Sequence, residues 1–427
     1  MTTSMLAQHL RPGDHVVIGQ AAAEPAGLVA ELIELAPRLG SLDVFCGYSF
    51  NPMWAQVLNP ALRVSTYCGL GTVRHQVARG SARVIPAQLS QLSAHFSSGK
   101  LRADVVLLQV APVDAEGYHS LGCAVDHVWD AAQAARAVLV EVNQQMPPTR
   151  SICRLHQSRV VVARQIDAPL AEPPHEAPSE VQARVAQQVA RLVPNGAAIQ
   201  LGIGGLAAAV AAALVQHRGL KLRSGMAGDW LLDLLASGAI DTAHPEACLV
   251  SLVAGSRSLY QSLGAGKPLE LAPVARLVAA PASGAAFPLI AINSAIEADL
   301  VGQVNAELLG ERYVGAMGGQ ADYLRAARRS PGGLAIIALP STTVAKAGPA
   351  SDGAVGANGT AVKSRIVRRL ANAYVTSAQS DIDFIVTEHG AADLRATTLE
   401  ERRRLIAQIA DPRFRADLLN GDVDDAA

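Results

Sequence analysis

One stretch, residues 199–235, constrains the fold of this chain more than any other. Its sequence, IQLGIGGLAAAVAAALVQHRGLKLRSGMAGDWLLDLL, predicts a strand that ends in a glycine loop, followed by an alanine-rich helix over residues 207–216. A second strand over residues 220–223, a tight turn and a helix from Asp229 come next. This order makes a βαβ unit, whose loops lie at the carboxyl ends of parallel strands. Because α/β proteins bind ligands at that edge, we expect the functional site here.

The same alternation of strands and helices extends along the rest of the chain. Residues 104–112 form an almost uninterrupted apolar run, which is typical of a strand covered on both faces, and residues 137–143 form another. Four prolines among residues 168–178 block helix and sheet alike, so we place a linker there. The 427 residues exceed what one core normally supports, about 250–300 residues. We predict an α/β protein with two domains, residues 1–178 and 179–427, each built on a mostly parallel sheet with helices packed around it.

Composition excludes several classes of function. The formal net charge is −1 and no basic stripe with interleaved aromatic residues occurs, which argues against a nucleic-acid partner. The apolar runs are short and broken by Gly, Pro or charge, so we expect no membrane span, and the first residues lack the apolar core of a secretory signal. We therefore expect a cytoplasmic protein. The five cysteines are widely spaced without a C-x-x-C pair, which favours reduced, buried thiols over a disulfide or metal framework.

Two glycine turns are the first candidates for chemistry. The turn LGIGG contains Gly202, Gly204 and Gly205, and the turn MGGQ contains Gly319. Such turns leave backbone N–H groups open, and at a helix N-terminus these groups can hold a phosphate or a developing oxyanion. Tight strand-to-helix turns also need glycine for purely steric reasons. The full G-x-G-x-x-G fingerprint, a Walker loop and a serine nucleophile elbow are all missing from the sequence.

Taken together, the motifs resemble a known family. GDHVVIG, DVVLLQVAPVDAEGYHSLG, VEVNQQMP, LGIGG, INSAIEADLVGQVN, GGQADYLRAA, ALPST and VTEHGAADLR occur in this order. They resemble the acetyl-CoA hydrolase/transferase family, the single-chain class I CoA-transferases that include 4-hydroxybutyrate and succinyl-CoA:acetate CoA-transferases. The resemblance implies two similar CoA-transferase-like domains with the site in the cleft between them. It also implies acyl-CoA and a small carboxylate as substrates, no covalently bound cofactor, and a homodimer or higher homo-oligomer.

The resemblance assigns roles to individual residues. In the family a glutamate carboxylate attacks the acyl-CoA thioester, and covalent anhydride and glutamyl-CoA intermediates follow. Matched by motif, the backbone N–H groups of Ile203 and Gly319 stabilise the oxyanions. Coenzyme A is expected along the second domain, at the residues that match the family's binding strings: Gly202, Gly204, Gly205, Ala295, Ile296, Gly315 and Lys346.

The catalytic glutamate itself is missing. The family carries it in a short H-S-E-M or T-E-V string after the alanine-rich helix, and here the matching string is RSGMAGDWLLDLL, with Gly225 at the position of the glutamate. A family asparagine upstream of INSA falls near Val278. Glycine has no side chain and cannot form either covalent intermediate. Three readings follow: a CoA-transferase that uses another carboxylate, an acyl-CoA hydrolase that uses water, or a non-catalytic CoA or acyl-CoA binder or partner subunit.

Other acidic residues are the candidates for a substitute carboxylate. Asp229 and Asp233 are nearest in sequence, but a helix N-cap is the favoured role for Asp229. Glu24 and Glu297 also lie in family strings, and we first assign them hydrogen-bonding roles. Residues 48–54 and 114–119 of the first domain are candidates for an acyl or carboxylate pocket. The resemblance favours short-chain acyl-CoA thioesters as substrates.

Overall fold

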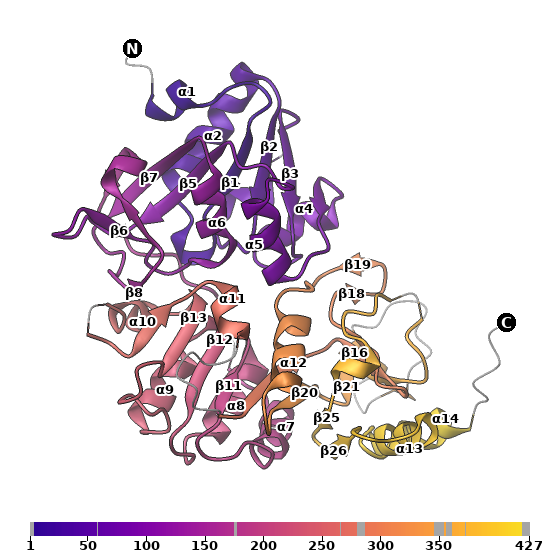
Figure 1. The fold of residues 1–427 in the computed structure, drawn as a ribbon. Helices are drawn as coiled ribbons and strands as arrows, with labels where there is room; N and C mark the ends of the chain where they lie inside the picture. Colours follow the sequence, from indigo (N-terminus) through magenta and orange to yellow (C-terminus); the bar gives the residue numbers. More distant parts are fainter. Residues whose placement is uncertain are drawn as a thin grey trace.

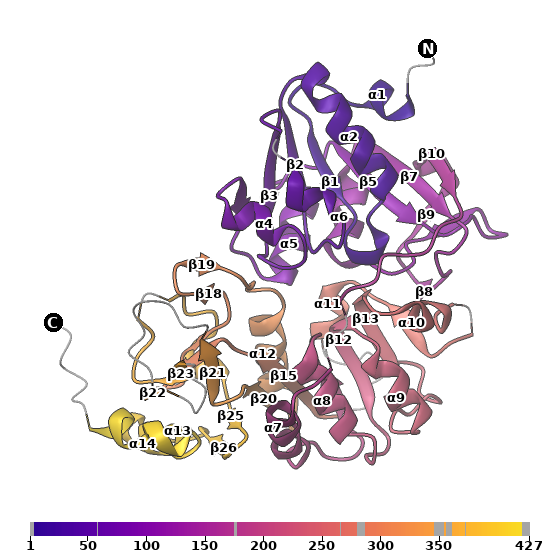
Figure 2. The same cartoon turned by 180° about the vertical axis from the view of Figure 1, so that it is seen from behind.

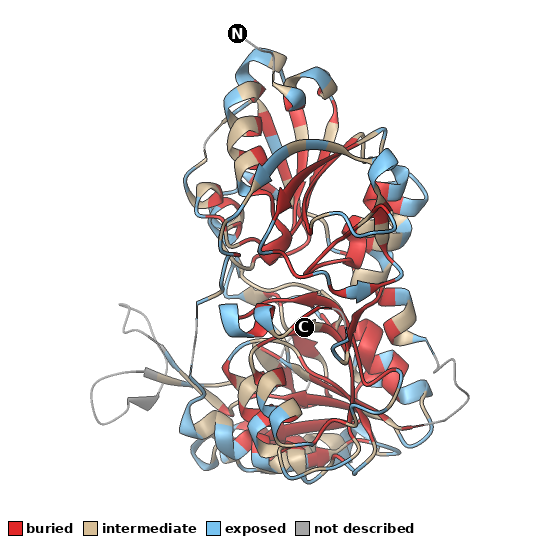
Figure 3. Cartoon of the chain, turned by 90° about the vertical axis from the view of Figure 1, so that its left-hand side faces the viewer, coloured by how far each residue is buried: buried red, intermediate tan, exposed pale blue. Residues whose placement is uncertain are grey.

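The computed structural model describes residues 4–57, 59–174, 177–264, 266–279, 287–345, 354–355, 361–371 and 373–420. It has two α/β units, each centred on its own sheet (Figure 1). Figure 3 shows that the buried residues are concentrated along both sheets. The predicted fold class, two similar units with mostly parallel sheets, is confirmed.

The first sheet has seven strands, all parallel, in the order β10-β7-β5-β1-β2-β3-β4. These strands are β1 (His15–Ile18), β2 (Leu42–Cys46), β3 (Leu62–Thr66), β4 (Ala82–Val84), β5 (Val105–Val110), β7 (Ala137–Asn143) and β10 (Val161–Ile166). The apolar runs at residues 104–112 and 137–143 are β5 and β7, and β5 is buried along its whole length, as predicted. The helices of this unit are α1 (Met5–His9), α2 (Ala26–Leu39), α3 (Met53–Gln56), α4 (Arg74–Ala78), α5 (Leu89–Ser97) and α6 (Asp126–Ala134).

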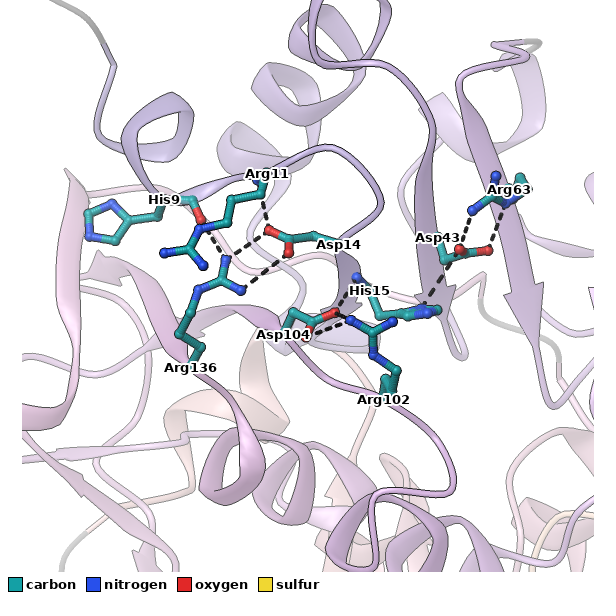
Figure 4. A network of polar contacts seen from close by, with 9 residues as sticks. All are labelled: His9, Arg11, Asp14, His15, Asp43, Arg63, Arg102, Asp104 and Arg136. Atoms are coloured by element: carbon teal, nitrogen blue, oxygen red, sulfur yellow. Dashed lines mark hydrogen bonds and ion pairs between the residues drawn. The ribbon is translucent and has the colours of Figure 1, made fainter.

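Ion pairs hold the amino ends of the first sheet, at the edge away from the second unit (Figure 4). Asp43 on β2 pairs with Arg63 on β3, and the Arg63 guanidinium lowers the pKa of that carboxyl. The carboxylate of Asp104, which directly precedes β5, accepts a hydrogen bond from the N–H of His15 at 2.8 Å. These contacts tie together strands whose sequence positions are far apart, so this edge has a structural role.

The second sheet has nine strands in the order β26-β25-β20-β15-β11-β12-β13-β14-β8, and only the pair β25 and β26 is antiparallel. Its strands are β8 (Arg150–Ser151), β11 (Ala198–Gln200), β12 (Lys221–Ala227), β13 (Cys248–Val253), β14 (Leu269–Leu271), β15 (Leu289–Ser294), β20 (Leu334–Ala338), β25 (Phe384–Thr387) and β26 (Gly390–Asp393). Strand β8 joins the second sheet although β10, which follows it in the chain, belongs to the first. The domain boundary at residue 178 stays a prediction.

The remaining helices and short strands surround the second sheet or lie at the edges of the first unit. The helices are α7 (Glu180–Ala190), α8 (Gly205–Ala213), α9 (Trp230–Ala236), α10 (Arg257–Gln261), α11 (Val274–Val278), α12 (Gln320–Arg329), α13 (Leu399–Gln408) and α14 (Pro412–Leu419). Short strands are β6 (Tyr118–Ser120), β9 (Arg154–His156), β16 (Glu297–Asp299), β17 (Val304–Asn305), β18 (Leu308–Leu309), β19 (Arg312–Tyr313), β21 (Thr342–Ala345), β22 (Ala354–Val355), β23 (Ala361–Ser364) and β24 (Ile366–Val367). No helix among the described residues is long and apolar enough to cross a membrane.

The βαβ unit forms where the sequence predicts it, with two corrections. Helix α8 begins two residues before the predicted start and ends at Ala213 instead of residue 216. Strand β12 continues to Ala227, where we expected a turn after residue 223. The strand is longer because its last residues pair with the carboxyl end of β13, with Met226 opposite Leu252. Gly225 therefore lies within a strand of the sheet.

The carboxyl edges of the two sheets face each other across the interface between the units (Figure 2). The N–H of Val125, in the first unit, donates to the carbonyl oxygen of Ser251 at 2.9 Å. The N–H of Val253 donates to the carbonyl oxygen of Cys123 at 2.8 Å. The five cysteines are all buried, as predicted, and none of them forms a disulfide.

Candidate active site

The LGIGG turn lies at the point where the strand order of the second sheet reverses. Strands β12, β13 and β14 extend to one side of β11, and β15, β20 and β25 extend to the other. A crevice at such a switch point is where open α/β sheets bind ligands. The side-chain amide of Asn293, near the end of β15, donates to Gln200, the last residue of β11, at 2.8 Å. The predicted coenzyme A residues Ala295 and Ile296 directly follow β15. The LGIGG string and the INSA string therefore lie side by side at the ends of β11 and β15.

Helices α8 and α12 both begin at the predicted glycine turns. Their N-cap residues are Gly204 and Gly319, and neither helix start has a side-chain capping hydrogen bond. The first N–H groups of a helix have no acceptor within the helix, so such ends can bind an anion or a carbonyl oxygen, although at α12 the N–H of Gln320 already donates to the carbonyl oxygen of Met317 at 3.3 Å. Gly204 has a φ of +91°, which requires glycine, and a Cβ atom at Gly202 or Gly204 would meet open space. Gly205 instead packs against Gln182.

Gly225 and Gly319 meet at one place in the interface. A Cβ atom at Gly225 would lie 3.4 Å from the Cε2 and Oη atoms of Tyr323 and 3.6 Å from Cδ1 of Leu89. A Cβ atom at Gly319 would lie 2.9 Å from Cε2 of the same tyrosine and 3.3 Å from Cδ1 of the same leucine. The hydroxyl of Ser224, next to Gly225, donates to the carbonyl oxygen of Leu201 at the start of LGIGG. The structure thus brings the predicted catalytic positions Ile203, Gly225 and Gly319 to one edge of the sheet.

The first unit holds the second glycine turn in place. The N–H of Gly69 donates to the carbonyl oxygen of Gly315 at 2.7 Å, and the N–H of Leu89 donates to that of Gly318 at 2.9 Å. The backbone N–H and the hydroxyl of Ser90 both donate to the carboxylate of Asp322, at 3.0 and 2.6 Å. A Cβ atom at Gly315 would overlap the carbonyl oxygen of Ala306, so only glycine fits there. The turn is therefore fixed by both units.

The acidic residues that we considered as substitute carboxylates are either hydrogen-bonded to other residues or exposed to solvent. Asp229 occupies the N-cap position of α9, but its carboxylate accepts hydrogen bonds from the N–H and hydroxyl of Ser256 at 2.9 and 2.7 Å and does not cap α9. We predicted correctly that Asp229 occupies the N-cap position, but its carboxylate does not bond the N–H groups of α9. It bonds Ser256 instead, because the start of α10 lies close to the Asp229 side chain. Asp233 is exposed on α9. Glu297 accepts a hydrogen bond from Asn305 at 2.9 Å, in agreement with its assigned role.

Glu24 forms a closed network inside the first unit. Its carboxylate accepts hydrogen bonds from the Ser49 hydroxyl, from the Asn51 amide at 2.9 Å and from the Trp54 indole at 2.8 Å. Burial raises the pKa of Glu24. The hydrogen-bonding role predicted for Glu24 is confirmed, and the polar side chains of residues 48–54 that we considered for an acyl pocket serve this network.

Residues 114–119 lie in the turn before β6 and in β6 itself, and of these residues His119 borders a separate cavity. Asp114 accepts the N–H of Tyr118 at 2.8 Å and closes the turn before β6. His119 borders an open cavity of about 500 Å³, together with Gln144, His156 and Gln165, and its Nδ1 donates to the carbonyl oxygen of Ala111 at 2.8 Å. Neither glycine turn lines this cavity. Lys346 lies outside the described residues, and the described chain has no cluster of metal-ligating side chains.

Sequence reasoning missed Leu89 and Tyr323, which lie beside Gly225, the position that we predict to match the family's glutamate. Tyr323 lies within the GGQADY string, but only the structure shows that its side chain lies next to Gly225. Leu89 comes from the other unit, and nothing in its sequence neighbourhood indicates a site. Burial raises the pKa of the Tyr323 phenol well above its usual value, so the phenol stays neutral.

Comparison with known proteins identifies similar chains. Models of the acetyl-CoA hydrolase/transferase N-terminal and C-terminal domains match residues 1–160 and 255–421. The chain is 31% identical over 417 residues to the 4-hydroxybutyrate coenzyme A transferase of Clostridium kluyveri, which covers 95% of this chain and 92% of that protein. RipA from Yersinia pestis has a TM-score of 0.83 at 26% identity, covering 97% of this chain and 94% of RipA. The 4-hydroxybutyrate CoA-transferase from Porphyromonas gingivalis has a TM-score of 0.76 at 30% identity, covering 97% and 94%.

Proposed function

The chain belongs to the acetyl-CoA hydrolase/transferase family, as its motifs predicted, and on that premise we propose that it hydrolyses short-chain acyl-CoA thioesters with water as the acceptor. The observation that carries the proposal is the environment of Gly225. This position has no carboxylate, yet it lies beside the second glycine turn and on the strand next to the first. In this proposal the nucleophile is missing while the backbone groups that would polarise a thioester are present.

In this proposal the coenzyme A thioester lies along the carboxyl edge of the second sheet, near Gly202, Gly204, Gly205, Ala295, Ile296 and Gly315. The N–H groups of Ile203 and Gly319 stabilise the oxyanion of the tetrahedral intermediate. Water oxygen bonds to the acyl carbon, the C–S bond breaks, and coenzyme A leaves as a thiolate that takes up a proton. Catalysis by oxyanion donors and binding alone reaches about 10³–10⁴ over water, which sets the expected rate.

The geometry disfavours a covalent transferase route. A substitute carboxylate needs a free oxygen beside the glycine turns, whereas Asp322 is bound by Ser90, and Asp229 is bound by Ser256. Among the described residues none of the acidic side chains named above is free at that place. A non-catalytic acyl-CoA binder is the second candidate, because Gly225 has no side chain that could act as a nucleophile or as a base. The homo-oligomeric state and cytoplasmic location stay predictions.

The test combines turnover with intact-protein mass. The purified protein is incubated with acetyl-, propionyl- and butyryl-CoA, free coenzyme A is followed with and without acetate, and the protein mass is measured. We expect slow release of coenzyme A that does not depend on acetate, with no covalent adduct. Acyl transfer to acetate together with an adduct would establish a substitute carboxylate. Tight binding of coenzyme A without any release would establish the binder.

A further inference from the structure

Tyr323 is the one polar side chain in contact with both Gly225 and Gly319 among the nearest atoms around these glycines. It lies in the first turns of α12, and its side chain is almost completely buried, with 1% exposure. Its hydroxyl has no hydrogen-bond partner within the part of the chain that the structure describes. A Cβ atom at Gly225 would lie 3.4 Å from this oxygen, so the hydroxyl borders the place of the lost carboxylate.

An unpaired buried hydroxyl costs free energy, because it gives up hydrogen bonds to water and gains none in return. Phenylalanine would fill the same space without that cost. Buried polar groups in folded proteins are nearly always paired, with protein or with bound water or ligand. The Tyr323 hydroxyl therefore points to a hydrogen-bonding molecule at this place during function.

We propose that the Tyr323 hydroxyl holds the attacking water beside the acyl carbon, in the place that the glutamate carboxylate has in the family. This inference rests on the proposed hydrolysis. The phenol is neutral, so it orients the water by a hydrogen bond and does not act as a base. The balance is unchanged: the water oxygen bonds to the acyl carbon, the C–S bond breaks, one proton goes to the coenzyme A thiolate and the other to solvent.

Leu89 gives this place a way to open. It is only half-buried, it belongs to the first unit, and its Cδ1 atom lies beside both glycines. In this inference a rotamer change of the Leu89 side chain admits water and the thioester, while the backbone hydrogen bond from Leu89 to Gly318 stays in place. The closed arrangement then excludes further water, which strengthens the hydrogen bonds to the oxyanion.

The test is Tyr323→Phe, with Tyr260→Phe as the matched control. Tyr260 is also buried, but its hydroxyl donates to the carbonyl oxygen of Ala171 at 2.9 Å and accepts the N–H of Gly255 at 3.1 Å. We expect Tyr323→Phe to lower kcat for coenzyme A release about tenfold or more, with KM little changed and Tm equal or higher. We expect Tyr260→Phe to lower Tm by about 2–4 °C with kcat unchanged.

The outcomes separate this inference from the proposed function. Release of coenzyme A by the unaltered protein, with kcat equal in Tyr323→Phe, overturns the role of the hydroxyl alone. A fall in kcat that is matched by a fall in Tm also overturns it, because a structural role would explain both. Absence of release by the unaltered protein overturns the proposed hydrolysis, and this inference with it.

Discussion

Replacing Gly225 by glutamate is the sharpest perturbation of this site, because it places a carboxylate at the strand position that we predict to match the family's nucleophile. The φ angle of Gly225 lies outside the left-handed region, so a side chain is tolerated by the backbone. The new Cβ atom makes ordinary contacts of 3.4 Å with Tyr323 and 3.6 Å with Leu89. The remaining atoms of the side chain must displace the Leu89 side chain, which is half-buried and flexible at its end.

The magnitude follows from two opposing effects. Placing a partly buried carboxylate at this interface costs about 2–4 kcal/mol. A hydrogen bond from the Tyr323 hydroxyl to the carboxylate returns about 1.5–3 kcal/mol, because bonds to charged groups are the stronger kind. We therefore expect a net destabilisation of about 1 kcal/mol, or a fall in Tm of about 2–4 °C.

The expected gain is chemical. Incubation of Gly225→Glu with acyl-CoA should give a protein whose mass has increased by that of coenzyme A less water, and acetate should discharge it with ping-pong kinetics. Turnover should rise about 100-fold or more, since loss of a nucleophile typically costs several orders of magnitude. Gly225→Gln is the control, because it has the same bulk and cannot form the anhydride. If Gly225→Glu folds and binds acyl-CoA but forms no adduct, the assignment of Gly225 to the nucleophile position is wrong.

Three further predictions test the rest of the structure. Gly319→Val places a Cβ atom 2.9 Å from Tyr323, so coenzyme A release should fall by about 100-fold; unchanged release in the folded variant would refute the oxyanion role. Glu24→Ala leaves the Ser49, Asn51 and Trp54 donors unpaired and should cost about 3 kcal/mol in denaturant titration, and a cost below about 1 kcal/mol would contradict the network. Arg413 lowers the pKa of Asp411 to about 2, so Asp411→Asn should lower the free energy of unfolding by about 1 kcal/mol. This loss should be full above the unfolded pKa of about 3.9 and should vanish as the pH falls through about 2. A loss that stays constant between pH 7 and pH 2 would refute the pairing.

The fold was accessible from the sequence because its signals are local. Uninterrupted apolar runs mark β5 and β7, and the glycine turns mark the starts of α8 and α12. The errors occur where tertiary pairing decides the outcome. Strand β12 runs past residue 223 because β13 supplies partners as far as Ala227, and no residue of β12 itself indicates that length. The short β8 joins a sheet formed mostly by residues that come later in the chain.

The site was accessible only in part, for a related reason. The positions Ile203, Gly225 and Gly319 follow from motifs, and the structure gathers them at one edge. The contacts that decide their chemistry come from elsewhere: Ser90 holds Asp322 across 232 positions of sequence, and Leu89 closes the place beside Gly225. Asp229 shows the same limit, because its position at the start of α9 predicts a cap, while its partner Ser256 directly precedes α10. Sequence spacing predicts which backbone turns exist and cannot predict which side chains meet.

If Gly225 does replace the family's nucleophile, as we predict, the arrangement of this site explains how the scaffold can persist without it. The groups expected to bind and polarise the thioester are backbone N–H groups at two helix starts, and their geometry depends on the sheet order and on the contacts of Gly69, Leu89 and Ser90 with the second unit. None of these depends on the residue at position 225. We expect the residue at position 225 to determine only whether a carboxylate or water attacks the acyl carbon. With glycine there, the proposed acceptor is water, and the two side chains that border this position, Tyr323 and Leu89, are expected to govern its approach.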